Sequence, residues 1–350
     1  MSEIKAYFNA REATDEGRGH VFAGIEGETS PDVIKDLPAF LKAAGRDYGI
    51  LKKAALVRDA FGGVDDNGNV CETVREVENQ FHLVRTHDGC VVSPSTVTGQ
   101  YAPLTLLDIA AEIQPWLNAG WVTPDAVYSG KNESLELLCL RMDAQGDLDE
   151  PFEHYIIFHN PHATGGKCKG RIMSFRRQCS NSFTSIGRGY EFTVGHRISA
   201  TLTPEEQQLE MLKRAKESAQ AWQTAQNYLT DLNAKIQGWQ DYVLGEGVAN
   251  DLTRSLLGIT DMEKASKRAL KRYDAIISAF NMPQFGTYGL TAYDWYNAVT
   301  FVNSSPNSET VQNSKVSPVA RMIRNTDPNG SGYKLELKAE NILNRYMANN

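Results

Sequence analysis

Three apolar segments typical of β-strands follow one another in the first half of the chain with no helical segment between them. They are AVYSG (126–130), SLELLCLRM (134–142) and EHYIIFHN (153–160). Parallel neighbours in a sheet need a crossover connection, usually a helix, whereas antiparallel neighbours need only a loop. The order therefore predicts an α+β fold with an antiparallel sheet, not a β-α-β series.

Further strands are expected upstream, at DYGILKKAALV (47–57), NQFHLVRT (79–86) and GCVVSPS (89–95). The last two are joined by His87-Asp88-Gly89. Asp and Gly both tolerate positive φ, so this junction predicts a hairpin.

Helical segments surround and follow these strands. One is expected over 31–45, ending at Gly45, and another over 104–120, interrupted at Pro115. A helical run of about forty residues begins at Thr203, which we expect to be its N-cap because Pro204 and two glutamates follow. It is either one long helix or two helices with a break near Thr230-Asp231.

The remaining helices are expected over 259–280, with Thr260 or Asp261 as N-cap, then near 291–303 and 331–348. The first of these three carries a second basic surface, formed by Lys264, Lys267, Arg268, Lys271 and Arg272. The expected organisation is an N-terminal extension (1–23), an α+β core (24–200) with a basic segment (163–197), a long helical region (201–280) and a helical closing segment (281–350).

Bulk properties exclude several classes of protein. No apolar run reaches eighteen residues and the N-terminus lacks the pattern of a signal peptide, so we expect a protein of the host cell cytoplasm with no membrane partner. The five cysteines are scattered without CxxC spacing, which argues against a disulfide framework and a structural zinc site. His154 and His159 are an odd number of residues apart and would face opposite sides of a strand, which weakens the case for a shared metal site. We therefore expect neither a metal nor a cofactor.

The stretch from 163 to 197 concentrates positive charge in an otherwise acidic protein. The whole chain has a formal charge of −7, yet this window holds seven Lys or Arg against one Glu. Aromatic residues alternate with the basic ones, as in proteins that bind single strands by combining a positive groove with stacking platforms. The window predicts a nucleic-acid-binding site formed by Lys167, Lys169, Arg171, Phe175, Arg176, Arg177, Arg188 and Arg197.

Several segments in a preserved order resemble one family, the phage- and plasmid-like proteins described as domain of unknown function nine hundred and thirty-two. The resemblance spans roughly residues 24 to 345. The matching positions are Ala43, Ala44 and Gly45, then Thr86, Asp88, Gly89, Tyr101 and Pro103, then Asn160 and His162, then Arg176, Cys179, Asn181 and His196, and finally Tyr296, Asn297, Ala298, Val299 and Thr300. The resemblance implies a protein of a mobile element and no particular activity.

Two departures from the family pattern stand out. VFAGIEG replaces the usual opening, and ATGG replaces the glycine-serine that follows the asparagine-x-histidine element. The order of predicted elements also resembles, in architecture alone, the core of phage single-strand annealing proteins.

The sequence carries no P-loop, GxSxG, HExxH or EF-hand motif. The first hypothesis is therefore a non-enzymatic protein that binds or anneals single-stranded DNA in recombination or replication, acting as a homo-oligomer. The second is an interaction protein that binds and inhibits a host defence or regulatory factor. A third is an enzyme that uses His162, Cys179 or His196, where Cys179 with a histidine would form a nucleophile pair.

Overall fold

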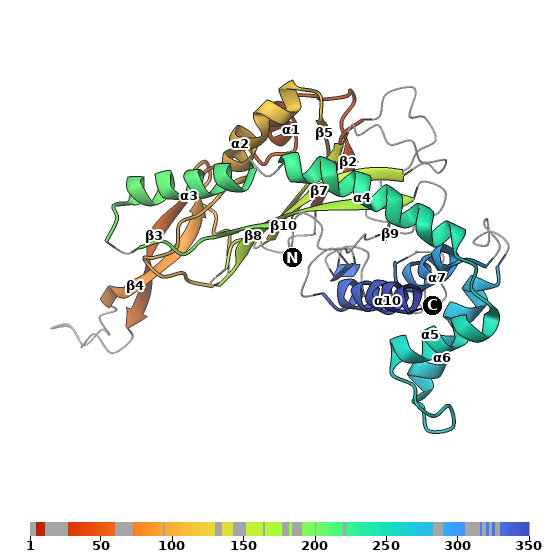
Figure 1. Cartoon of the computed structure of the whole chain (residues 1–350). Coiled ribbons are helices and arrows are strands. Elements are labelled where there is room, and N and C mark those ends of the chain that lie inside the picture. The colour runs from red at the N-terminus through yellow and green to blue at the C-terminus, as the bar shows by residue number, and fades with distance from the viewer. Residues whose placement is uncertain are drawn as a thin grey trace.

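The computed structural model describes most of the chain. The described residues are 5–10, 27–59, 73–93, 95–129, 135–142, 152–163, 165–176, 182–183, 191–199, 201–219, 222–282, 290–304, 316, 320–321, 324–325 and 330–349. They form a large twisted sheet with a long hairpin on one side and a bundle of helices on the other (Figure 1).

The main sheet has the strand order β10-β8-β7-β6-β5-β1-β2, and β9 pairs with β8. Its strands are β1 (Lys5–Phe8), β2 (Gly27–Thr29), β5 (Val122–Ser129), β6 (Leu135–Met142), β7 (Phe152–Pro161), β8 (Lys167–Arg176), β9 (Ser182–Phe183) and β10 (Glu191–Gly195). All neighbours are antiparallel except β1 and β2, which run parallel. The α+β class with an antiparallel core is confirmed.

The first strand lies inside the sheet. Lys5–Phe8 pairs with β5 on one side and β2 on the other. These residues were expected to belong to an N-terminal extension, but Ala6 and Phe8 are buried at 5% exposure against the sheet.

Alternation along the strands gives the sheet two buried faces. In β7, Ile156 and Phe158 point into the main core, whereas Tyr155 and Ile157 point into a second, smaller cluster. The same alternation places His154 and His159 on opposite faces, as expected from their odd spacing.

Two helices cover the main-core face of the sheet. They are α1 (Leu37–Ala43), after which Gly45 adopts a φ of +65°, and α2 (Leu106–Asn118). The expected interruption at Pro115 is wrong, because α2 continues through it. Burial of Ile113 and Trp116 on either side of the proline offsets the missing hydrogen bond.

A separate two-stranded hairpin, β3 (Ile50–Asp59) with β4 (Thr73–Arg85), projects from the body of the molecule (Figure 1). The predicted partnership of 79–86 with 89–95 is only partly confirmed. Gly89 turns with a φ of +70°, but among the described residues the returning chain forms only isolated bridges to β4, Val91 with Val84 and Val97 with Phe81.

The helical part contains α3 (Pro204–Ala219), α4 (Trp222–Asp241), α5 (Glu246–Leu257), α6 (Lys267–Phe280), α7 (Ala292–Ser304) and α10 (Ser331–Ala348). The N-terminus of α3 is as predicted, since Thr203 and Glu206 form a reciprocal cap. The break predicted near Thr230 is wrong, because that residue is interior to α4. The predicted N-cap of α6 is also wrong, because Ser266 accepts the capping hydrogen bond from Ala269 N.

Helix α7 is the centre of the helical part. Twelve of its thirteen residues are buried, including Trp295, Tyr296 and Val299. Thr291 and Asp294 cap its start reciprocally, and Trp295 Nε1 donates to Thr253 Oγ1 of α5 at 2.9 Å. A helix that is surrounded by other elements needs such internal partners for its polar atoms.

Replacing Trp295 with Ala is expected to lower the free energy of unfolding by about 3–5 kcal/mol, the cost of emptying a large aromatic side chain from a core. Denaturant unfolding of the wild type and the variant measures it. Trp121, which is 41% exposed, supplies the matched control, since Trp121→Ala should cost about 1 kcal/mol or less. Equal losses for the two variants would contradict the central role of α7.

Candidate functional site

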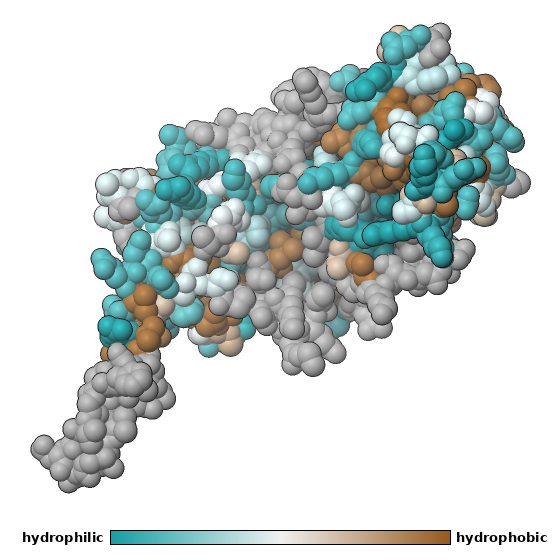
Figure 2. All heavy atoms as spheres, turned by 90° about the horizontal axis from the view of Figure 1, so that it is seen from below, coloured by the Kyte–Doolittle hydropathy of each residue, from teal (hydrophilic) through white to brown (hydrophobic). Residues whose placement is uncertain are grey.

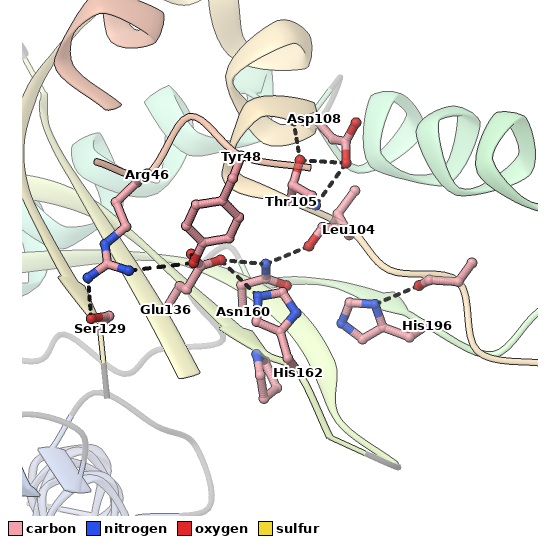
Figure 3. Close-up of polar contacts among 12 residues, drawn as sticks. Arg46, Tyr48, Leu104, Thr105, Asp108, Ser129, Glu136, Asn160, His162 and His196 are labelled. Carbon is pink, nitrogen blue, oxygen red and sulfur yellow. Dashed lines mark hydrogen bonds and ion pairs between the residues drawn. The ribbon is translucent and has the colours of Figure 1, made fainter. Parts of the chain in front are cut away.

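A buried polar cluster lies where β6, β7 and the end of β10 meet the chain between α1 and β3 (Figure 3). We call it the Glu136 cluster. Its members, with exposures between 0% and 7%, are Arg46, Tyr48, Glu136, Asn160, His162 and His196. Among the positions that match the family pattern, five polar or sulfur-bearing ones form a motif, namely Asn160, His162, Cys179, Asn181 and His196. The Glu136 cluster brings three of them together, Asn160, His162 and His196, around a carboxylate that this motif does not contain.

Glu136 is the centre of the hydrogen-bond network. Its Oε2 contacts His162 Nε2 at 2.8 Å and its Oε1 accepts from the Tyr48 hydroxyl at 2.7 Å. Register explains the position of the motif, because Glu136 lies directly opposite Asn160 in the β6–β7 pair. Asn160 Nδ2 donates to the Leu104 carbonyl at 2.7 Å, which ties the sheet to the chain that leads into α2.

The partners decide the protonation of Glu136. Burial opposes ionisation, but the hydrogen bonds and charges of His162, Tyr48 and Arg46 together hold its pKa below the ordinary value. An ionised carboxylate only accepts hydrogen bonds, so His162 donates to it through Nε2. Arg46 also donates to Ser129 on β5, which fixes the guanidinium beside Tyr48.

His196, in contrast to the ionised Glu136, is neutral at pH 7. Burial, and secondarily the charge of His162, lower its pKa to about 4 although its Nδ1 donates to the Ala102 carbonyl at 3.1 Å. Its ring stacks on Tyr101 with centroids 4.8 Å apart. Its Nε2 and the Nδ1 of His162 are buried without a partner among the described residues. The two rings lie next to each other in Figure 3.

These ring nitrogens do not make a metal centre on their own. Zinc sites use three or four protein ligands. The described part of the chain contains no group of three or more His, Cys, Asp or Glu suited to a metal. Nearby Cys168 is buried, and burial followed by the charge of Glu136 raises the pKa of its thiol to about 12. This thiol is therefore protonated at neutral pH and a poor nucleophile.

The cluster is better suited to holding the fold together than to chemistry on a substrate. Every member is at least nine-tenths buried, so a substrate has no route to Glu136 or His162 without rearrangement. Cys179 and Asn181, the other two motif residues, lie outside the described residues.

The basic stretch forms β8, whose alternation sorts its side chains. Lys167, Lys169 and Arg171 share one face, while Cys168 and Ile172 point into the main core. Lys167 is exposed and Lys169 half-buried. Arg171 is only 7% exposed, because its guanidinium lies 4.2 Å from the ring centre of Tyr333 on α10. A direct phosphate contact by Arg171, as predicted, is therefore unavailable.

The structure describes only some of the other residues that were predicted to bind nucleic acid. Arg197 is exposed after β10, with its Nε donating to Gln100 Oε1 at 3.0 Å. Phe175 and Arg176 are the last residues of β8, and their side chains lie outside the described part of the structure. Arg177 and Arg188 lie outside the described residues altogether.

A cleft of about 430 Å³ opens between β3 and the starts of α2 and α3. Lys52 lines it, and burial lowers the pKa of this lysine. Its Nζ donates to the Gly99 carbonyl at 2.9 Å and to Gln207 Oε1 at 3.0 Å. Asp108 and Glu205 also line the cleft, so its charge is mixed.

The protein thus has an α+β fold with a helical part, and its candidate site is a buried network of a carboxylate and histidines. Comparison with known protein families, curated proteins and solved structures finds no match. The resemblance to the phage- and plasmid-like family stays a prediction. No helix among the described residues is both long and apolar enough to cross a bilayer.

Sequence reasoning missed Glu136, Tyr48 and Arg46. A signal existed for the first, because Glu136 shares strand parity with Leu138 and Leu140, which point into the main core. A carboxylate on a buried face requires partners. For Tyr48 and Arg46 no local signal existed, since their partners in the sheet, Glu136 and Ser129, are more than eighty residues away along the chain.

Substituting Glu136 with Gln keeps the size of the side chain and removes its charge. The free energy of unfolding should fall by about 3 kcal/mol or more, because the variant leaves buried donors of His162 and Tyr48 without their ionised acceptor. Denaturant unfolding at pH 7 checks this, with exposed Glu263→Gln as the control. A loss as small as the control's would show that the network is dispensable.

His196 should make stability pH-dependent. Its folded pKa of about 4 lies below the ordinary 6.5, so the unfolded chain binds the proton more tightly between these values. The contribution of neutral His196 to the free energy of unfolding is therefore fully present above pH 6.5. It is lost as pH drops, by about 3 kcal/mol down to pH 4.

The measurement is denaturant unfolding from pH 7.5 to pH 5.5, a range that lies above the ordinary pKa of carboxyl groups and over which the loss should reach about 1.4 kcal/mol. His196→Gln, whose amide can still donate to Ala102, should flatten the curve. An unchanged slope in His196→Gln would refute the assignment.

Proposed function

We propose that this protein binds single-stranded nucleic acid, foremost single-stranded DNA, through its phosphates and without bond-making chemistry. The observation that carries the proposal is a group of basic side chains on β8, just after the edge strand β10, and on the projecting hairpin. We call this group the cationic track. Its members are Lys52, Lys167, Lys169 and Arg197.

The sheet part of the track follows from register. Lys167 lies opposite Gly195, and Lys169 lies opposite Thr193 on the edge strand β10. The space beside Gly195 is open, since a Cβ there would meet nothing within 4 Å. A phosphate can therefore approach the backbone beside the ammonium group of Lys167.

The track reaches the hairpin through the chain from Gly99 to Tyr101. Arg197 bridges to Tyr101 in the backbone and to Gln100 through its side chain. Two residues earlier, the Gly99 carbonyl accepts from Lys52. The Lys52 ammonium lies 5.7 Å from the ring centre of Phe81, so an aromatic surface accompanies the charge, as in single-strand binding sites.

Charge placement makes the track selective within an acidic protein. The formal charge of −7 disfavours wrapping of nucleic acid over the whole surface. Asp108 and Glu205 on the wall of the cleft repel phosphates there. A phosphate chain is therefore expected to pass over the rim at Lys52 rather than enter the cleft.

Binding without catalysis accords with the Glu136 cluster being closed to solvent. Annealing needs the phosphate backbone held and the base edges left accessible for pairing. Together with the resemblance, this supports a role in recombination or replication of a phage or plasmid.

The hairpin favours contact with another polypeptide as a second candidate function. Leu56 and Val74 on its distal part are 59% and 57% exposed. Among the described residues only two isolated bridges, from Phe81 and Val84, cover the β4 edge, and a two-stranded ribbon with an uncovered distal part is marginal alone and accepts a further strand readily. The ribbon supports a homo-oligomer, as an annealing protein requires, and equally a host or phage protein partner.

Binding of a labelled single-stranded oligonucleotide should weaken steeply with salt, with a log-log slope near −0.7 for each phosphate contacted. The double variant Lys167→Gln with Arg197→Gln should bind at least tenfold more weakly and lose about 1.4 from the slope magnitude. Fluorescence anisotropy from about 50 to 200 mM salt measures both.

Lys42→Gln, at the exposed end of α1, is the matched control and should leave binding unchanged. A wild-type protein that binds no oligonucleotide at about 50 mM salt would contradict the proposal. In that case Leu56→Ser should be tested for loss of self-association, which would support the interaction function.

A further inference from the structure

Four arginines gather in the helical part, away from the cationic track. Arg268 and Arg272 lie one turn apart on α6, and Arg321 and Arg324 belong to the chain that precedes α10. Burial, and then the charges of neighbouring arginines, lower the pKa of Arg272, Arg321 and Arg324. The four guanidinium groups therefore lie close enough to repel one another. We call them the arginine cluster.

Within the described part of the chain none of the four forms an ion pair. Arg272 Nη2 donates to Asn303 Oδ1 of α7 at 3.1 Å, and Arg321 Nη2 donates to the Val316 carbonyl at 3.3 Å. The Nε atoms of Arg272 and Arg324 are buried with no partner among the described residues. Buried donors on cations normally have an acceptor.

The described carboxyl group that interacts with Arg272 and Arg324 does not neutralise the cluster. Glu336 of α10 is fully buried and accepts from Asn303 Nδ2 at 2.7 Å. The charged groups that face it are Arg272 from α6 and Arg324 from the chain before α10, while Asn303 of α7 is neutral. Burial outweighs all three and raises the pKa of Glu336 to about 8. At neutral pH this carboxyl is mainly protonated, so Glu336 does not compensate the positive charge of the arginine cluster.

The cluster adjoins the first turn of α10, which itself attracts anions. Gly330 is the N-cap of this helix and provides no side-chain cap. A Cβ at Gly330 would overlap the Arg324 carbonyl, and one at Gly332 would overlap the Asn325 side chain. The two glycines therefore allow the arginine-bearing segment to pack directly against the helix start, where unpaired N–H groups and the dipole favour negative charge.

We propose that the arginine cluster and the start of α10 form a binding site for a phosphate group. Arginine suits this ligand because its planar fork donates two parallel hydrogen bonds to phosphate oxygens. Arg268 is exposed and the other three arginines are half-buried, so the site opens toward solvent at α6. Hydrophilic residues gather over the helical part in the view from below (Figure 2). The site does not depend on the proposed function.

The test is a titration of the full-length protein with inorganic pyrophosphate at pH 6.5, followed by calorimetry. The wild type should bind, and Arg324→Gln should bind at least tenfold more weakly. Arg324→Lys, which keeps the charge without the fork, should fall between them. Lys264→Gln, an exposed cation 86% accessible near α6, should match the wild type. Thermal unfolding shows whether each variant is folded.

A second readout is the pH dependence. Ionisation of Glu336 as pH rises through about 8 adds negative charge to the site, so pyrophosphate affinity should fall over that range. Glu336→Gln should abolish this fall while keeping the affinity measured at pH 6.5. No binding at 10 mM pyrophosphate by the wild type, or equal binding by folded Arg324→Gln, would overturn the proposal.

A third arm identifies the source of the phosphate. If pyrophosphate binds and Arg324→Gln also weakens binding of the single-stranded oligonucleotide, the site takes phosphates of a nucleic acid. If oligonucleotide binding is unchanged, the site takes a free phosphate compound. Because the cationic track is tested by Lys167→Gln with Arg197→Gln, failure of one proposal leaves the other measurable.

Discussion

The buried carboxylate of Glu136 is the interaction on which the rest of the sheet domain depends. A carboxylate removed from water must have partners, and here they come from two separate stretches of chain, Arg46 with Tyr48 and Asn160 with His162. The strands can pair in their observed register only if Asn160 and His162 arrive beside Glu136. The network thus selects one arrangement of the sheet, the α1–β3 connection and the entry into α2.

A second glutamate, Glu336, is also buried away from water, but its carboxyl group is protonated rather than ionised. Glu336 keeps its proton, because one amide hydrogen bond and the charges of two arginines do not offset the effect of burial on its pKa. Glu136 gives up its proton, because a phenol, an imidazole and an arginine surround it. The contrast explains why one region of the molecule is electrically balanced and internal, whereas the other holds an excess of positive charge that opens to the surface.

Local patterns predicted most of the fold. Short apolar runs without an intervening helical segment identified β5, β6 and β7, and the cap at Thr203 identified the start of α3. The continuation of α2 through Pro115 could not be predicted, since burial of its neighbours in the assembled core overrides a local preference. Likewise, the sequence placed His162 and His196 in one motif, but their encounter with Tyr48 and Arg46 arises only from tertiary packing. Arg171 was mistaken for a surface residue because its covering ring, Tyr333, lies far along the chain.

The position of β1 sets an order on the assembly of the sheet during synthesis. Lys5–Phe8 is bordered by β5, which ends at Ser129, so β1 waits after its own synthesis for more than a hundred further residues before this partner is complete. At about 5–20 residues per second, that wait lasts on the order of ten seconds. Until then β2, whose one neighbour is β1, has no place in the sheet. Any factor that holds the nascent β1 segment would therefore delay completion of the β1–β2 end of the sheet.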